Sequence, residues 1–371
     1  MSDLIVCSLE SWDAVWRRNQ YLVAALLDQD PRLRVLFVEP PADTLFDLAR
    51  RRRPTRARGL RRVEGLGDGR LWVYQQAKLA PRRAGAFVDS ALSAGVRRVA
   101  RRIGLHDPLL WINDPARAPL VPATGWPAIY DITDDWLLAT RSPRELARLR
   151  NNEDMLMRQC RAVVVCSSGL AATKSGVRPV ELITNGVDLA RYTTALPRPH
   201  DLPPGPIALY VGTLHEDRLD VDLAVHTADV LGDVATLVFV GPNALDPRHT
   251  QVLASRSNVL LLGARPHTAV PAYLQHADVL VVPHVVDGFT DSLDPIKLYE
   301  YLAVGRPVVA TPVAGFREAG GTVRTAPSGD FAWHVRELAI TRAPSVAPPI
   351  GLPTWQRQAA RFAEVLSAAV R

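Results

Sequence analysis

The chain has 371 residues, of which 47% are hydrophobic and 22% are charged, and its formal net charge is +6. Because single hydrophobic cores stop growing near roughly 250–300 residues, this length predicts two domains. The composition is that of a packed globular protein and excludes a largely disordered chain. No apolar run approaches the roughly 20 residues that a membrane-spanning helix needs.

The amino-terminal residues, MSDLIVCSLE, predict a first strand, because they lack the basic and then apolar regions of a signal peptide. Cys7, Cys160 and Cys166 lie in or beside apolar segments, without the spacing of a metal site or of a disulfide framework. These features predict a protein of the reducing cytoplasm.

Basic residues are concentrated between Arg50 and Arg102. This segment holds sixteen lysines and arginines against three acidic residues, a net charge of +13. Such a one-sided excess attracts polyanions, such as anionic lipid, nucleic acid or a phosphorylated substrate. A solvated, arginine-rich surface is the alternative explanation. The arginine run lacks interleaved aromatic residues for base stacking, so we expect no nucleic-acid partner.

The first half of the chain predicts a series of buried parallel strands. They are short apolar runs rich in β-branched residues, separated by stretches with helical spacing such as 86–103 and 143–159. The runs are residues 4–9, 34–38, 71–75, 109–112, 128–132, 162–166 and 181–184.

A proline-rich segment follows, and then the same alternation resumes. Residues 196–206, LPRPHDLPPGP, hold five prolines and predict a linker. Both halves together predict an α/β fold of two doubly wound parallel sheets, with ligands bound beyond the carboxyl ends of the strands in a central cleft. The later strands are expected at 207–211, 236–240, 259–262, 279–282 and 307–310.

The first strand of the second half leads into YVGTLHEDRLD, residues 210–220. Gly212 lacks a β-carbon, so a backbone N–H group there can approach an anion closely, and Arg218 supplies a fixed positive charge. The segment VGPN at 240–243 has a similar glycine. Glycines also end strands for ordinary reasons, so these positions alone do not specify a site.

Residues 294–312, DPIKLYEYLAVGRPVVATP, predict a helix followed by a buried strand. Asp294 is a suitable N-cap, Pro295 suits the first helical position, and Gly305 is the matching stop.

Lys297 and Glu300 lie on one face of this helix, near the amino-terminal N–H groups that favour a pyrophosphate. A lysine there neutralises phosphate charge, and a carboxylate one turn further on accepts both hydrogen bonds of a ribose diol. The alternative is that Lys297 and Glu300 form an exposed ion pair worth well under ~1 kcal/mol.

Segments spread over nearly the whole chain resemble the retaining GT-B glycosyltransferases of the large GT4-like group, glycosyltransferase group 1. The resemblance is greatest to the bacterial branch that acts in cell-surface and exopolysaccharide assembly. It implies two Rossmann-like domains, with a UDP-, GDP- or dTDP-linked sugar bound by the second domain and an acceptor bound mostly by the first. The segments are SWDAVWRRNQYLVAALL (11–27), RVLFVEPP (34–41), AIYDITDDW (128–136), CSSGLAATK (166–174), ELITNGVDLARY (181–192), YVGTLHEDRLDVDL (210–223), DPIKLYEYLAVGRPVVAT (294–311) and TWQRQAARFAEVL (354–366).

From the resemblance and the linker we expect four parts. They are an acceptor-binding domain at 1–195, the linker at 196–206, a nucleotide-sugar domain at 207–345, and a tail with a helix crossing back to the first domain at 346–371.

By the same resemblance, Glu300 binds the donor ribose, while Arg218 and Lys297 bind the diphosphate and stabilise the departing nucleoside diphosphate. Gly212 and Thr213 line the phosphate loop.

One donor-side position departs from the family pattern, and the loop that holds the nucleotide base supplies one further candidate. Many relatives carry a glutamate eight positions before Glu300, where this chain has Ser292, so Ser292 and Leu293 are expected to contact the donor sugar. The nucleotide base in relatives lies on the loop that matches 263–274, where His267 is a candidate contact.

The first domain supplies further candidates. Asp134 and Asp135 occur where many relatives have a histidine near the reaction centre, although Thr133 with these two residues also suits a helix N-cap. The loop after the first strand carries acceptor-binding candidates, with an ordinary helix start and aromatic anchor as the alternative. These candidates are Trp12, Arg17 and Arg18.

The expected activity is transfer of a sugar from a nucleotide sugar to an acceptor hydroxyl with retention of configuration, in cell-surface polysaccharide or glycolipid assembly. No cofactor or metal is expected, because cationic side chains and helix N–H groups balance the leaving charge. The basic segment, Arg50 to Arg102, predicts peripheral docking on the anionic inner face of the membrane. Alternatives are a soluble secondary-metabolite acceptor, a sugar-nucleotide epimerase, or a non-catalytic nucleotide binder, the last favoured by Ser292.

Overall fold

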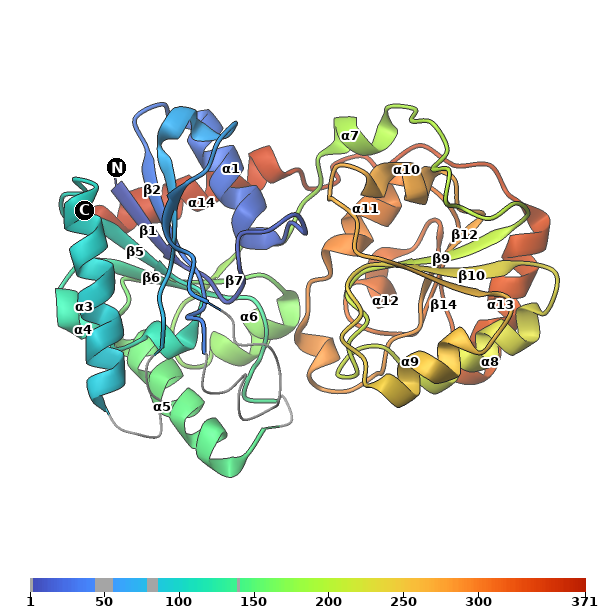
Figure 1. Ribbon diagram of the computed structural model, residues 1–371, viewed down its shortest axis with the longest axis horizontal. Coiled ribbons are helices and arrows are strands. Elements are labelled where there is room, and N and C mark those ends of the chain that lie inside the picture. The colour runs from blue at the N-terminus through green and yellow to red at the C-terminus, as the bar shows by residue number, and fades with distance from the viewer. Residues whose placement is uncertain (1–2, 44–55, 79–85, 139–140) are drawn as a thin grey trace. The chain divides into compact units, whose positions relative to one another are not determined.

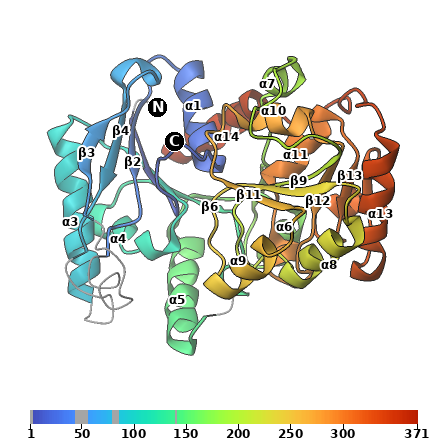
Figure 2. The same ribbon diagram turned by 45° about the vertical axis from the view of Figure 1, so that its right-hand side comes forward.

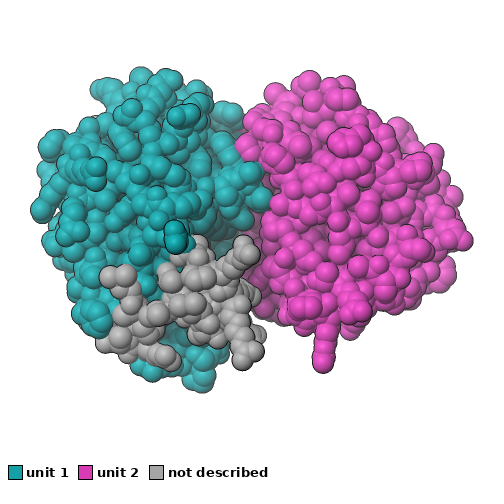
Figure 3. Space-filling model, viewed as in Figure 1, with its two compact units in different colours: residues 1–184, 355–371 teal, residues 185–354 magenta. Residues whose placement is uncertain are grey.

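The computed structural model describes residues 3–43, 56–78, 86–138 and 141–371 (Figure 1). The chain forms two compact units, which Figure 3 colours separately. Unit 1 comprises Met1–Thr184 and Trp355–Arg371, and unit 2 comprises Asn185–Thr354.

Unit 1 contains an eight-stranded sheet among its described residues, in the order β3-β4-β2-β1-β5-β6-β7-β8. Neighbouring strands are parallel except β3, which is antiparallel to β4. Strand β3 was not predicted, because its short sequence GLRR lacks an apolar run. The strands are β1 (Asp3–Cys7), β2 (Arg34–Val38), β3 (Gly59–Arg62), β4 (Leu71–Gln75), β5 (Leu109–Ile112), β6 (Ala128–Ile132), β7 (Ala162–Val165) and β8 (Glu181–Leu182).

Helices cover both faces of this sheet, as a doubly wound fold requires. One face packs on α3, α4, α5 and α6, in a core that includes Ile5, Val96 and Leu156. The other face packs on α1 and α14 (Figure 1). The helices are α1 (Arg18–Gln29), α14 (Trp355–Val370), α3 (Ala86–Arg102), α4 (Leu120–Thr124), α5 (Pro143–Gln159) and α6 (Ser168–Lys174).

Helix α14 belongs to unit 1 although it follows all of unit 2 in the sequence. The Trp355 ring stacks on Tyr21 of α1, with 4.7 Å between ring centroids, and Phe362 lies 4.4 Å from the Trp111 ring of β5. The side chain of Gln358 donates a hydrogen bond of 2.8 Å to the carbonyl of Thr184. Aromatic burial therefore attaches this helix to the first unit.

Unit 2 contains a six-stranded sheet among its described residues, in the order β11-β10-β9-β12-β13-β14, with all pairs parallel. This is the strand order of a doubly wound nucleotide-binding fold. The strands are β9 (Ile207–Val211), β10 (Thr236–Val240), β11 (Val259–Gly263), β12 (Val279–Val282), β13 (Val308–Ala310) and β14 (Val323–Thr325).

Successive side chains of β9 enter different cores: Leu209 faces one helical layer and Tyr210 the other. The first layer is made by α7 (Leu189–Thr193), α10 (Val270–Gln275), α11 (Ile296–Val304) and α12 (Phe316–Ala319). The second layer is made by α8 (Val221–Leu231), α9 (Pro247–Ala254) and α13 (Ser328–Thr341) (Figure 2).

Residues 196–206, which we expected to form a linker, lie within unit 2. Leu202 is buried in the unit 2 core, and Asp201 accepts hydrogen bonds from Arg265 (2.6 Å) and Tyr273 (2.8 Å). The prolines exclude a helix or a central strand, but they do not prevent a packed loop. The chain instead passes between the units at 184–185 and again at 354–355.

Within the described ranges, every helix is too short or too polar to cross a membrane.

Candidate functional site

The carboxyl ends of β9 and β10 form a tight double loop in unit 2. The amide of Gly212 donates a hydrogen bond of 2.9 Å to the carbonyl of Val240. Gly241, with φ of 150°, lies so close that a β-carbon there would be 2.0 Å from the Gly212 oxygen. A side chain at 241 is therefore impossible without moving the backbone, and the glycine of VGPN is structurally required.

Helix α11 starts at the same edge of the sheet, with one change from the prediction. Pro295, not Asp294, is its N-cap, and Pro295 has no side-chain acceptor. The Asp294 carboxylate instead accepts hydrogen bonds from the Tyr299 hydroxyl (2.7 Å) and the Asn185 amide (2.5 Å). These partners hold Asp294 away from a capping position. The predicted stop is confirmed, because Gly305 is left-handed with φ of 70°.

Lys297 lies in the first turn of α11 and is half-buried. Its Nζ is 3.9 Å from the centroid of the Tyr210 ring and 3.4 Å from Nε2 of His284. A β-carbon at Gly212 would be only 2.9 Å from this nitrogen, so the lysine lies against the loop after β9. Burial, together with the charge of Arg218, lowers the pKa of Lys297 to about 7, and Glu300 opposes that shift.

Arg218 approaches the same place from the loop before α8. Its carbonyl accepts a hydrogen bond of 2.9 Å from the amide of Val285, and its guanidinium carbon is 5.8 Å from the Phe289 ring centroid. Its charge lowers the pKa of both Lys297 and His284. Arg218 and Lys297, the two cations predicted to act on one diphosphate, thus lie close enough that the charge of one lowers the pKa of the other.

Glu300 is one turn further along α11. The Tyr192 hydroxyl of α7 donates a hydrogen bond of 2.5 Å to Glu300 Oε1. Burial raises the pKa of Glu300, while the Tyr192 hydrogen bond and the charge of Lys297 act in the opposite direction. The carboxylate is therefore fixed in orientation by a residue that the sequence did not identify.

His284, in the loop after β12, is buried, with 4% of its surface exposed. Its Nε2 lies 3.2 Å from the Tyr210 hydroxyl, and Thr311 Oγ1 both accepts from its amide and donates to its carbonyl. Burial and the nearby charges of Lys297 and Arg218 lower its pKa well below the usual range. Its position just after β12, at the ligand-binding edge, was the signal that could have identified it.

The remaining donor-side candidates lie in three loops. Ser292 is buried in a short 3-10 turn at Thr290–Ser292, and its hydroxyl donates a hydrogen bond of 2.7 Å to the Phe289 carbonyl. Leu293 follows it and is also buried. Thr213 follows Gly212, and His267 lies between β11 and α10, partly exposed.

In unit 1, the two aspartates after β6 have different environments. Asp135 is buried and pairs with Lys174 (3.2 Å), which also pairs with Glu153 (2.8 Å). Asp134 accepts a hydrogen bond of 3.2 Å from the Thr133 hydroxyl and is less buried. Residues 136–138 form a turn, in which the amide of Leu137 donates a hydrogen bond of 3.3 Å to Asp135 Oδ1.

The three acceptor candidates also differ. Arg18 is buried and forms two hydrogen bonds to Asp131, of 3.2 and 3.3 Å, so its guanidinium stabilises the core of unit 1. Arg17 is partly exposed and lies 3.4 Å from Asp13. The Trp12 ring packs on Phe37 with 5.0 Å between centroids. Of the three, Trp12 and Arg17 retain partly exposed surface at the carboxyl end of β1.

Part of the basic segment neutralises acids within unit 1. Glu39, which is fully buried, pairs with Arg58 (2.7 Å) and Arg61 (2.8 Å). In contrast, Arg98, Arg101 and Arg102 of α3 are exposed. Six basic residues of the segment lie outside the described residues, namely Arg50 to Arg53, Arg82 and Arg83.

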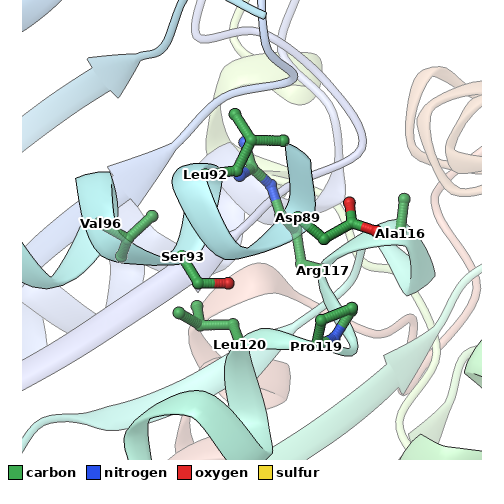
Figure 4. Close-up of a pocket in the computed structure, with 8 residues that line it drawn as sticks. All are labelled: Asp89, Leu92, Ser93, Val96, Ala116, Arg117, Pro119 and Leu120. Carbon is green, nitrogen blue, oxygen red and sulfur yellow. The ribbon is translucent and has the colours of Figure 1, made fainter. Parts of the chain in front are cut away.

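Two other features of the described residues do not qualify as the site. Glu216, Asp246 and His249 form a cluster near the surface. The His249 ring hydrogen-bonds to Glu216 (2.9 Å), and this bond accounts for their proximity without an ion. A cavity between α3 and the start of α4, lined partly by Asp89 and Arg117, has an interior of about 10 Å³ (Figure 4). That volume holds at most one water molecule.

Part of the chain is similar in sequence to known glycosyltransferases. Residues 205–339, most of unit 2, match the family described as glycosyl transferases group 1. TuaH of Bacillus subtilis (strain 168), named as a glycosyltransferase of teichuronic acid biosynthesis, is 24% identical over 218 residues. The matched stretch covers 54% of this chain and 55% of TuaH, so it spans about half the length of that relative.

Solved structures resemble the chain over almost its full length. HepE of Anabaena, in complex with UDP and glucose, matches 99% of this chain and 100% of its own with a TM-score of 0.67 and 16% identity. The E. coli trehalose-6-phosphate protein bound to UDP-2-fluoro glucose matches 98% and 99%, with a TM-score of 0.62 and 10% identity. The chain therefore has the two-sheet α/β fold of the GT-B glycosyltransferases, and its residues 205–339 carry the sequence features of the glycosyl transferases group 1 family.

Proposed function

We propose that the protein is a glycosyltransferase of the retaining GT4-like group, which moves a sugar from a nucleotide sugar to an acceptor hydroxyl in cell-surface polysaccharide or glycolipid assembly. The match of residues 205–339 to the group 1 family supports the reaction class. The similarity to TuaH supports a role in cell-surface polymers, and the UDP and glucose in the HepE structure make UDP-glucose the first donor to test.

The observation that carries the proposal is the constellation at the carboxyl edge of the unit 2 sheet. Arg218 and Lys297 share one electrostatic environment beside the loop of Gly212, and Glu300 lies one helical turn beyond Lys297. Two cations and helix N–H groups suit a diphosphate, and an oriented carboxylate suits a ribose diol. An exposed Lys297–Glu300 ion pair does not describe this arrangement, because both residues are at least half-buried and Glu300 bonds to Tyr192.

The chemistry follows from these charges. As the bond between the anomeric carbon and the phosphate oxygen breaks, negative charge grows on the leaving diphosphate, where Arg218 and Lys297 stabilise it. The acceptor oxygen attacks on the face that the diphosphate leaves, and its proton passes to a diphosphate oxygen. This path needs neither a carboxylate nucleophile nor a metal ion. We therefore also propose that the reaction requires no metal.

The acceptor side is proposed to lie in unit 1. Trp12 and Arg17 offer partly exposed aromatic and cationic surface at the carboxyl end of β1, and Asp134 is partly exposed, whereas Asp135 is buried beside Lys174. We propose that Asp134 orients the acceptor or a donor hydroxyl. We also propose that the exposed arginines of α3 hold the protein to anionic lipid, where a lipid-linked acceptor is available.

The test is incubation of the purified protein with UDP-, GDP- and dTDP-linked sugars. Slow release of nucleoside diphosphate, increased by extracts that contain lipid-linked acceptors, supports a transferase, and the anomeric proton coupling of the product reports retention. A new sugar isomer would instead show an epimerase. Thermal stabilisation without turnover would show a binder, and both results would contradict the proposal.

A pair of charge-matched variants links the activity to the site. Arg218→Gln removes one positive charge from the constellation, and we expect turnover to fall by about 10²–10³-fold, as for the loss of one group that stabilises a transition-state charge. Arg324→Gln, on β14, removes one charge from an exposed ion pair with Glu337 of α13, and it serves as the control. Equal activity of the two variants would contradict the assigned role of Arg218.

A further inference from the structure

The amine of Lys297 is enclosed on three sides within unit 2. The Tyr210 ring lies on one side, with its centroid 3.9 Å from Nζ, and the imidazole of His284 lies on another, 3.4 Å away. The backbone of Gly212 closes a third side, where even a methyl group would be 2.9 Å from Nζ. Few water molecules can therefore reach this amine, and its charged form depends on the groups around it.

His284 is held rigidly, and its imidazole is neutral. Thr311 Oγ1 donates a hydrogen bond of 2.8 Å to its carbonyl, and the Tyr210 hydroxyl lies 3.2 Å from its Nε2. Burial and two neighbouring cations keep the pKa of His284 well below its usual range. A neutral imidazole with its proton on Nδ1 presents Nε2 as an acceptor, and this is the atom nearest Lys297.

Besides burial, four neighbouring groups among the described residues bear on the charge of Lys297. Arg218 in the loop before α8 opposes a second positive charge, and Glu300 on α11 favours it. His284 and Tyr210 are neutral at physiological pH, because burial lowers the pKa of the histidine and raises that of the tyrosine. Burial, with the Arg218 cation acting in the same direction and the Glu300 carboxylate against it, lowers the pKa of Lys297 to about 7, so the amine is largely uncharged at slightly alkaline pH.

A diphosphate changes this balance, because it brings at least two negative charges next to Arg218 and Lys297. We propose that a nucleoside diphosphate binds this site together with one proton from solvent, which converts the amine of Lys297 to an ammonium while His284 holds that amine in place. His284 is then a positioning residue, since it acts through Lys297. The inference rests on the function proposed above, and it adds a pH dependence that a permanently charged cation pair would not have.

Titration calorimetry of the full chain with UDP tests the proposal. At about pH 8, in buffers of different ionisation enthalpy such as HEPES and Tris, the dependence of the binding enthalpy on the buffer gives the protons taken up. We expect close to one proton for the wild type, and an affinity that falls by up to tenfold per pH unit from about pH 8 to pH 9.5. Lys297→Arg, which keeps its charge, is expected to lose both the proton uptake and this pH dependence.

Two variants of His284 separate positioning from simple packing. His284→Phe removes the acceptor, and we expect at least a tenfold loss of UDP affinity at pH 7, whereas His284→Gln, which retains an acceptor, is expected to recover most of that loss. The melting temperature of each variant monitors folding. Equal affinity of the Phe and Gln variants with equal stability would overturn the role of His284.

The outcomes also separate this inference from the proposed function. UDP binding with no proton uptake at pH 8, or with the same uptake in Lys297→Arg, would overturn the inference alone. If UDP, GDP, dTDP and ADP all fail to bind the wild type between about pH 6 and pH 9, both the proposed function and the inference are overturned.

Discussion

The hydroxyl of Tyr192 donates a 2.5 Å hydrogen bond to Glu300 Oε1, joining two residues that are 108 positions apart in the sequence. Helix α7 thereby contributes to the site that α11 presents. The bond leaves Oε2 as the oxygen free of Tyr192, and it opposes the rise that burial causes in the pKa of Glu300.

Removing this bond should weaken nucleotide binding. Tyr192→Phe is expected to raise the pKa of Glu300 further and to reduce UDP affinity by at least about tenfold, because a hydrogen bond to a charged group contributes roughly 1.5–3 kcal/mol and about 1.4 kcal/mol is tenfold in affinity. Glu300→Gln should lose at least as much. The comparison of UDP with 2′-deoxy-UDP measures the ribose contact: the 2′-hydroxyl should matter in the wild type and matter little in Glu300→Gln. The same preference in both proteins would place the ribose elsewhere.

Lys297 should also make the stability of the ligand-free protein depend on pH. Its folded pKa of about 7 is below the ordinary value of 10.5, so between these values the unfolded chain binds more protons than the folded chain. The free energy of unfolding therefore rises with pH in this range, by less than about 1.4 kcal/mol per pH unit.

The useful window for this measurement is about pH 7 to pH 9. Above it, the buried thiols of Cys7 and Cys160, whose pKa burial raises to about 12, act in the opposite direction, because the unfolded chain then loses protons that the folded chain keeps. Denaturant unfolding of Lys297→Met is the reference. We expect the wild type to gain stability relative to this variant as the pH rises, and parallel curves would show that Lys297 has an ordinary pKa.

The two aspartates after β6 should respond differently to the same chemical change. Asp135→Asn removes a partner from the buried Lys174, which retains Glu153, so we expect a loss of about 1–3 kcal/mol in unfolding free energy. Asp134→Asn should leave the melting temperature nearly unchanged and reduce turnover. If Asp134→Asn has full activity with the acceptor, the proposed orienting role of Asp134 is wrong.

Binding to membranes should depend on the exposed arginines of α3. A triple change of Arg98, Arg101 and Arg102 to Gln is expected to weaken co-sedimentation with anionic vesicles more than tenfold, since each arginine near such a surface contributes roughly 1 kcal/mol in favourable cases. Changing the exposed Arg144, Arg150 and Arg158 of α5 removes the same charge and serves as the control. Equal effects of the two triples, or equal wild-type binding to neutral vesicles, would argue against a specific docking surface.

Turnover should survive metal chelation. Because Arg218 and Lys297 are proposed to balance the diphosphate charge, EDTA at millimolar concentration should change the rate by less than about twofold. A loss that Mg²⁺ or Mn²⁺ restores would contradict this expectation. His249→Ala would then show whether the exposed cluster of Glu216, Asp246 and His249 holds the ion.

The strands and the long helices could be predicted well, because their signal is local. The runs at 34–38, 71–75, 236–240 and 279–282 are strands with the predicted bounds, and 143–159 is the predicted helix. Both sheets and the GT-B fold agree with the expectation. Strand β3 was not predicted, because an edge strand stabilised by pairing to β4 needs little apolar sequence of its own.

The site was only partly predictable, because its supporting contacts are distant in sequence. Arg218, Lys297 and Glu300 lie in recognisable segments, and the structure brings the first two together. Tyr192 has no local signal, since its role arises when α7 packs beside α11, and His284 is indicated only by its position just after β12. The partner of Arg18, one of the acceptor candidates, could not be predicted for the same reason, since Asp131 is 113 positions away.

The attachment of α14 to unit 1 has a consequence for how the protein is made. Unit 2 is a continuous stretch, 185–354, so a ribosome delivers all of its residues before the last helix emerges. Unit 1 is complete only when Trp355 and Phe362 cover Tyr21 and Trp111. Until then, part of its aromatic surface is exposed to solvent and to chaperones. During synthesis, the half of the protein that begins first is therefore the half that matures last.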